Sequence, residues 1–263
     1  MIIIIIAAAV FCFFLYLKYL KAASKKKQPV KTQEVVSTAK PEESEKITNL
    51  LKEKTEKKQY TIEIEESKVP SISDSKFGGY PYWDFAKEYP VNESGEKMQL
   101  LAQINFSKEA LNDELLPQKG MLQFFIAANS DYMGMDFDDE TNQKDFRIVF
   151  HEDINDSVSV EKVKELGMPS GFDNDSTPVL KECAFKLKKE QAFIDPSDYD
   201  YSSILEKTIA DAGLDKNLCD DDSLKEKLHE SLCKETSSVL GYPSFTQSDP
   251  RENLSEDDAK YFD

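Results

Sequence analysis

The sequence predicts an α+β fold of mainly antiparallel sheets with flanking helices. Two short stretches, residues 98–106 and 120–127, are the basis for this prediction, because side chains of two kinds alternate along both. A period of two is typical of a strand, whereas a helix repeats every 3.6 residues. The link between the stretches contains Pro117, so we expect a connection longer than a tight hairpin.

Each of these two strands is expected to have two distinct faces. The first strand would place Gln103 and Asn105 on one face, together with Leu101, and four apolar residues on the other: Leu100, Ala102, Ile104 and Phe106. The second would place Gln123 between Met121 and Phe125, opposite Leu122, Phe124 and Ile126. Polar residues therefore lie inside two predicted core strands.

The remaining elements follow from periodicity and from helix-end signals. Further strands are predicted over 60–65, 146–150 and 183–187. The first of them is expected to be an edge strand with one solvent-exposed face. Helices are predicted over 41–56 and 160–166. Two more helices are predicted after these. The first starts at a capping box in 203–206 and is ended by Gly213. The second has acids at 220–222 and a leucine stripe.

The composition excludes several classes of function. The formal charge is −17, and the only charges within residues 1–27 are five lysines, so the rest of the chain is more acidic still. Nucleic-acid phosphate repels such a surface, so no nucleic-acid partner is expected. The four cysteines form no Cys-x-x-Cys pair, and the acidic run at 136–140 lacks the pattern of a calcium loop. We therefore expect no metal and no cofactor.

The amino-terminal run predicts a membrane anchor. Residues 2–17 carry no charge, and Tyr19 and Leu20 extend the apolar run to residue 20. About 19 helical residues span ~28 Å, close to the thickness of a hydrocarbon core. The lysines all follow the run, so the positive-inside rule predicts an outside amino terminus and a cytoplasmic domain. The expected organisation is an anchor at 1–21, a flexible tether at 22–40 and a domain at 41–263.

A short motif occurs twice. Gly241-Tyr242-Pro243 repeats Gly79-Tyr80-Pro81, and the first copy precedes the strand at 98–106. The repeat predicts an internal duplication, in which the core strand of the second copy would follow Asp263. We therefore expect a domain truncated at its carboxy terminus.

Several motifs in a fixed order carry a family resemblance. They are Ser-Lys-Phe-Gly-Gly at 75–79, Leu-Leu-Ala-Gln-Ile-Asn-Phe at 100–106, Lys-Gly-Met-Leu-Gln-Phe-Phe-Ile at 119–126, Asn-Gln-Lys-Asp-Phe-Arg at 142–147 and Gly-Tyr-Pro-Ser-Phe-Thr-Gln-Ser-Asp-Pro-Arg at 241–251. Together they resemble the YwqG-like family of domains of unknown function, over about residues 41–263. The resemblance implies an α+β fold with antiparallel sheets, and it implies no reaction.

The polar residues of the predicted strands form the candidate ligand-binding site. They are Gln103, Asn105, Gln123 and Arg147, with Gln247, Asp249 and Arg251 joining from the second half of the repeat. One interpretation is a pocket at the seam between the halves, whose amides and guanidinium groups hold a polar or anionic ligand. The other is that these side chains satisfy buried main chain and one another.

Catalysis has little support in the sequence. Only two histidines are present, His151 and His229, and no nucleophile elbow or metal motif occurs. The predicted function is therefore a membrane-tethered, non-catalytic module that binds a protein or a small polar ligand. The alternative is a small-molecule enzyme, hydrolase-like, that uses a polar pocket around Arg147 and residues 247–251.

Overall fold

The computed structural model describes residues 39–127, 132, 134–136, 139, 141–169, 179, 181–234, 236–245, 249 and 251. The predicted anchor at 1–21, nearly all of the tether at 22–40, and Gln247 lie outside these residues. No helix within the described ranges is long and apolar enough to cross a membrane. The chain divides into two compact units: unit 2 is Ile62–Lys188, and unit 1 takes the described residues up to Thr61 and from Lys189 onward.

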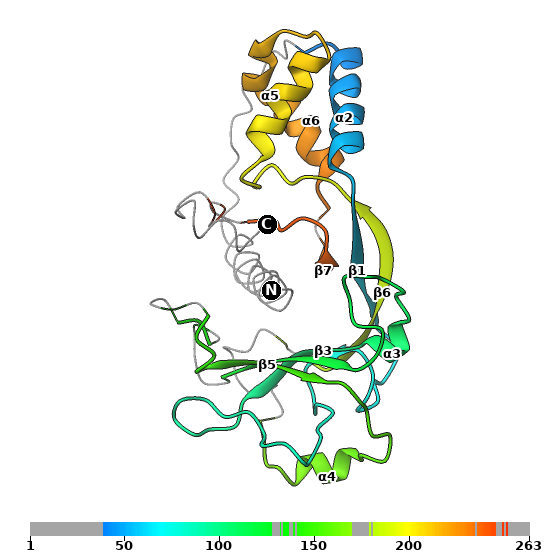
Figure 1. The fold of residues 1–263 in the computed structure, drawn as a ribbon, viewed down its shortest axis with the longest axis vertical. Coiled ribbons are helices and arrows are strands. Elements are labelled where there is room, and N and C mark those ends of the chain that lie inside the picture. The colour runs from blue at the N-terminus through cyan, green and yellow to red at the C-terminus, as the bar shows by residue number, and fades with distance from the viewer. Residues whose placement is uncertain are drawn as a thin grey trace. The chain divides into compact units, whose positions relative to one another are not determined.

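Unit 2 is built on an antiparallel sheet (Figure 1). Its strands are β2 (Lys76–Phe77), β3 (Gln99–Asn105), β4 (Met121–Ile126) and β5 (Phe146–His151), followed in the hydrogen-bonded order β5-β4-β3-β2-β6 by the first part of β6 (Cys183–Ala192). Two short helices, α3 (Phe106–Glu109) and α4 (Val160–Lys164), lie in its connections. The two strands predicted from the alternation at 98–106 and 120–127 are β3 and β4, and they pair with one another.

One predicted face of β3 is wrong because the strand contains a β-bulge. The register with β4 shifts between Leu100 and Ala102, so Leu100 pairs with Phe125 while Ala102 pairs with Phe124. An extra residue on one strand reverses the alternation beyond it. Leu100 therefore shares a face with Gln103 rather than with Ala102. There it packs with Phe125 and Trp83 in one apolar cluster.

Unit 1 contains a helical core. Helices α2 (Pro41–Thr55), α5 (Tyr201–Asp211) and α6 (Asp222–Leu232), with the 3-10 helix η1 (Lys216–Asp220), pack around buried residues that include Ile47, Leu51 and Ile209 (Figure 1). The predicted leucine stripe is the buried face of α6: Leu224, Leu228 and Leu232. Apolar residues at a spacing of about four fall on one side of a helix, so burying that side stabilises it.

The ends of two helices differ in how well the sequence predicted them. The acids at 220–222 were assigned correctly, because the Asp221 side chain accepts a hydrogen bond from the Leu224 amide at the start of α6. The capping box at 203–206 is wrong: α5 begins two residues earlier, and the Ser203 hydroxyl donates to the Asp200 carbonyl. Gly213 follows the end of α5 with a φ of +68°.

The predicted edge strand at 60–65 is an internal strand. The observed β1 (Lys57–Glu65) pairs antiparallel with β7 (Ser238–Leu240), and in unit 1 the hydrogen-bonded order is β6-β1-β7. The alternation in β1 is weak at its start, where Gln59, Tyr60 and Thr61 are all buried. The α+β class, with mainly antiparallel pairing and flanking helices, is confirmed.

Both copies of the Gly-Tyr-Pro motif begin with a glycine that is sterically required. Gly79 has a φ of +70° and Gly241 a φ of +81°, a region that only glycine enters freely. A Cβ at Gly79 would lie 2.3 Å from Glu182 Oε1, and one at Gly241 would lie 2.7 Å from Gln59 Oε1. Each glycine therefore allows its turn to approach a neighbouring segment of its own unit.

Candidate functional site

The two glutamines of the central strands form a buried amide pair. Gln103 on β3 and Gln123 on β4 face one another, and both are fully buried. Gln103 Oε1 accepts a hydrogen bond from the Tyr82 amide at 3.0 Å, and its Nε2 donates to the Ile72 and Asp74 carbonyls, each at 2.8 Å. Gln123 Nε2 donates to the Tyr82 carbonyl at 2.7 Å and to Gln103 Oε1 at 3.1 Å.

Two further side chains bind the same segment of main chain. Asn105 Nδ2 donates to the Ser73 carbonyl at 2.6 Å. The buried Lys76 ammonium donates to the Tyr80 carbonyl at 2.7 Å and to Glu182 Oε1 at 2.6 Å. The pKa of Lys76 is lowered, because the effect of burial outweighs that of the ion pair with Glu182, which by itself would raise the pKa.

These contacts explain why polar residues lie inside core strands. The main chain of 72–74 and 79–82 flanks the two-residue strand β2 and belongs to no strand, and buried side chains supply hydrogen bonds to it. A buried main-chain group that lacks a partner costs roughly 1–3 kcal/mol. The geometry matches the structural interpretation of Gln103, Asn105 and Gln123, and their role in ligand binding stays a prediction.

His151 extends the network as a neutral side chain. Its Nε2 lies 2.9 Å from Gln123 Oε1, which is an acceptor because the amide nitrogen already donates to Tyr82. Nε2 therefore carries the hydrogen, and the buried Nδ1 has no partner in the described part of the chain. The Tyr82 and Trp83 rings meet the imidazole edge-on. Burial, and then the positive charge of Lys87, lower the pKa of His151 to about 4.

Arg147 has a different environment. It lies on β5 opposite Phe125, and its half-buried side chain lines a shallow surface pocket of about 450 Å³. Its Nε is buried and has no hydrogen-bond partner among the described residues. No carboxylate of the described ranges pairs with its guanidinium. In a chain with a charge of −17, an arginine that pairs with no acid of the described ranges stands out.

The rest of the pocket is polar with one apolar wall. The lining residues are Val91, Asn92, Glu93, Asn142, Gln143, Lys144 and Arg147. The Lys144 ammonium lies 3.9 Å from both Glu93 and Asp136, so its charge is only loosely neutralised. Gln143 Oε1 accepts a hydrogen bond from the Ile148 amide, and no described residue bonds to its Nε2. The pocket thus offers cationic and amide donors beside a small apolar surface.

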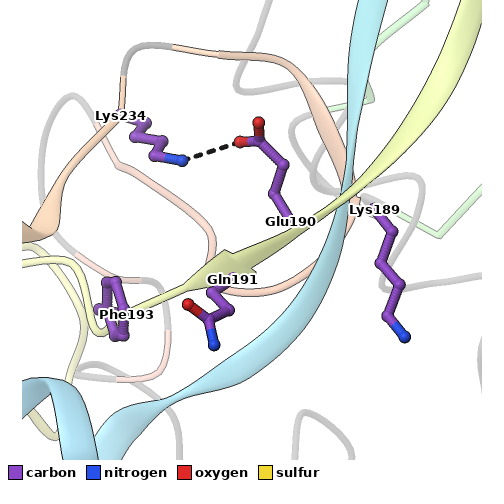
Figure 2. Close-up of a pocket in the computed structure, with 5 residues that line it drawn as sticks. All are labelled: Lys189, Glu190, Gln191, Phe193 and Lys234. Atoms are coloured by element: carbon purple, nitrogen blue, oxygen red, sulfur yellow. Dashed lines mark hydrogen bonds and ion pairs between the residues drawn. The ribbon is translucent and has the colours of Figure 1, made fainter.

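A second pocket, in unit 1, offers less. It measures about 480 Å³ and is lined by Lys189, Glu190, Gln191, Phe193 and Lys234. Figure 2 shows the Glu190 carboxylate pointing toward Lys234, 2.8 Å away, while Lys189 points away from both. Gln191 Nε2 donates to Glu56 Oε1 at 2.8 Å. Most of the polar groups here are already paired, so the Arg147 pocket is the better candidate.

Two predicted residues of the second half, Asp249 and Arg251, belong to an ion-pair cluster within unit 1. Arg251 contacts Asp249 at 2.6 Å and Asp198 at 2.9 Å, and Asp249 Oδ2 also accepts from the Tyr199 amide. Burial alone would raise the pKa of Asp249, but the hydrogen bonds from Arg251 outweigh it and lower the pKa. These charges neutralise one another and fasten residues 249–251 to the loop at 198–199.

Sequence reasoning did not identify the residues that contact the predicted site residues in the structure. Tyr82 and Lys76 are members of the network, and Asn92, Gln143 and Lys144 line the Arg147 pocket. The motif at 75–79 contained Lys76, but nothing in the pattern indicated that its ammonium is buried. The pocket residues come from two separate loops, so no local spacing marks them.

The fold and the site define an α+β domain whose central polar residues hold an irregular segment against an antiparallel sheet. The profile of the family described as "Domain of unknown function (DUF1963)" matches residues 75–262, more than half of the chain. The chain therefore belongs to this family of domains of unknown function. The resemblance to YwqG-like domains is compatible with this membership. No curated protein matches the chain.

Prediction for His151. The pKa of His151 is about 4 in the folded chain and about 6.5 when unfolded, so the unfolded chain binds more protons between these values. The stabilisation is complete above pH 6.5 and is lost as the pH falls toward 4. We expect the free energy of unfolding to fall by about 2 kcal/mol between pH 7 and pH 5. Urea denaturation of the full chain at each pH measures this loss.

The control is His151→Gln, which keeps a donor for Gln123 Oε1 and cannot be protonated. We expect this variant to lose much less stability between pH 7 and pH 5 than the parent does. Equal losses in the two proteins would contradict the assignment.

Proposed function

We propose that the chain is a non-catalytic binding module that uses the Arg147 pocket to hold a ligand bearing a carboxylate. The single observation behind this proposal is the half-buried Arg147, whose Nε has no partner in the described residues. A buried donor of a charged group is costly when it stays unpaired, so a ligand that supplies the acceptor gains that energy. A guanidinium also presents two parallel donors, which match a carboxylate.

The surrounding charges favour a ligand with one negative charge. Lys144 adds a loosely paired cation, but Glu93 lines the same pocket and Asp136 lies 3.9 Å from Lys144. These acids repel a ligand with several charges, such as a phosphate ester, more than they repel one carboxylate. Val91 is 40% exposed and provides an apolar contact for the stem of such a ligand.

Binding is favoured over catalysis by the position of His151. Residues four apart on a strand are separated by about 13 Å, so Arg147 and His151 lie too far apart to act on the same atoms. His151 is also 1% exposed and bonded to Gln123. A general base has to reach the proton that it removes, and this imidazole is closed off from a ligand in the pocket.

Prediction for Arg147. The probe is acetyl-glutamate amide (acetyl-Glu-NH2), whose one charge is the side-chain carboxylate. It should bind the full chain weakly, and Arg147→Gln should weaken that binding about tenfold or more, because one charge-assisted interaction contributes roughly 1.5–3 kcal/mol. NMR titration measures the affinity and identifies the site through the shifts of β5 amides. The matched probe acetyl-glutamine amide (acetyl-Gln-NH2) has the same shape without the charge, and we expect it not to bind.

A control variant distinguishes the pocket from general charge. Lys189→Gln removes an exposed lysine of the other unit and the same unit of charge, so it should leave the affinity unchanged. Equal effects of Arg147→Gln and Lys189→Gln would contradict the proposal, as would equal binding of the two probes.

We also propose that residues 2–20 hold this module at a membrane. The support is the sequence itself, because the run carries one charge, Lys18, and lysines follow it directly. The family match begins only at residue 75, so the run lies outside the matched domain.

Prediction for the membrane anchor. After expression in cells, the full chain should stay in the membrane pellet during an alkaline carbonate wash, since an apolar helix partitions into the bilayer irrespective of pH. A variant that lacks residues 1–21 should move to the supernatant. Release of the full chain by the same wash would contradict the anchor.

A further inference from the structure

Glu93 is the acid that lines the Arg147 pocket. Its side chain is 67% exposed, and within the described ranges its carboxylate accepts no hydrogen bond. The nearest cation of those ranges is the Lys144 ammonium, 3.9 Å away, which is longer than a charge-assisted hydrogen bond. No ion pair joins Glu93 to Arg147, although both line the same described pocket. The pocket therefore presents a cationic group and an anionic group that do not neutralise each other.

The two other acids beside the pocket have partners of their own. Asp136 accepts a hydrogen bond from the Asn142 side chain at 3.2 Å and also lies 3.9 Å from Lys144. Asp145 Oδ1 accepts from the main-chain amide of Glu93 at 3.2 Å. Of these three acids, Glu93 is thus the one whose carboxylate can receive a cationic group of a ligand.

The charges around the pocket disfavour a ligand with a net negative charge. Two cations, Arg147 and Lys144, lie among three acids, Glu93, Asp136 and Asp145. The net charge of −17 on the whole chain adds repulsion of any anion at long range. A ligand whose own charges sum to zero avoids this repulsion, and it can still bring a carboxylate to the guanidinium.

We propose that the ligand of the Arg147 pocket is a small zwitterion, an amino acid whose carboxylate and ammonium are joined by a short aliphatic stem; this inference rests on the carboxylate site proposed above. The carboxylate binds Arg147, and the ammonium donates to the Glu93 carboxylate. The stem between them covers Val91, which is 40% exposed. Lys144 keeps Asp136 as its partner when the ligand ammonium occupies Glu93.

The pocket has the size of a site for a small molecule. Its volume is about 450 Å³, in the lower part of the range of roughly 300–1,000 Å³ that holds small ligands. Since Arg147 and Glu93 form no ion pair with each other, a ligand has to extend between them to reach both. A stem of a few methylene groups does this, and it also supplies the surface that covers Val91.

Prediction for the zwitterion. The probe is glutamic acid α-amide (H-Glu-NH2), which differs from acetyl-Glu-NH2 only in its uncapped amine, and this amine is largely protonated at pH 7. NMR titration of the full chain at pH 7 should show that H-Glu-NH2 binds about threefold more tightly than acetyl-Glu-NH2. The expected gain is small because an ion pair at an exposed carboxylate is weak.

The variant Glu93→Gln separates the two ligands by the direction of its effect. It should weaken binding of H-Glu-NH2 about threefold, because the ammonium loses its partner. It should leave binding of acetyl-Glu-NH2 unchanged or slightly stronger, because the acid that it removes repels this anion. The matched control is Glu66→Gln, which removes an exposed acid in the turn at 66–67 of the same unit and should change neither affinity.

Two results would overturn the zwitterion. One is binding of H-Glu-NH2 that is no tighter than that of acetyl-Glu-NH2, and the other is an equal effect of Glu93→Gln on both ligands. In either case, binding of acetyl-Glu-NH2 that Arg147→Gln weakens would leave the carboxylate site intact. Failure of both ligands to bind, or binding that Arg147→Gln does not change, would overturn the carboxylate site itself.

Discussion

The buried amide pair of Gln103 and Gln123 is the constraint on which unit 2 depends. Both side chains are fully buried, so every donor and acceptor that they carry needs a partner. They find most of those partners in the main chain at Ile72, Asp74 and Tyr82, none of which belongs to a strand. The glutamine side chains of the sheet and the main chain of the irregular segment therefore supply hydrogen-bond partners to one another. Replacing either glutamine by an apolar residue would leave main-chain groups unpaired, at a cost of roughly 1–3 kcal/mol for each.

The network also determines which polar residues remain available to a ligand. Gln103, Gln123 and Asn105 use their amide groups on the protein itself, and His151 bonds to Gln123. Arg147 shares their face of the sheet but lies beyond the segment they bind, and its Nε has no partner in the part of the chain that the structure describes. The binding proposal therefore concerns the edge of the sheet rather than its centre.

Local periodicity predicted the elements well, and long-range pairing could not be predicted from it. The alternation around Gln123 identified β4, and the leucine spacing identified α6. The bulge near Leu100 was missed, because an inserted residue keeps the local pattern intact and only the partner strand reveals it. The sequence also placed Gln103 among candidate ligands. Its actual partners are main-chain groups some 20 to 30 residues earlier, which carry no sequence signal.

Hydrogen exchange at the Tyr82 amide tests the central claim most directly. This amide lies outside any strand, yet Gln103 Oε1 accepts its proton in the buried interior. The account predicts that it exchanges as slowly as the amides of β3 and β4, and far more slowly than those of the exposed turn at 66–67. Exchange as fast as in that turn would show that the glutamines do not hold this segment, and would contradict the account.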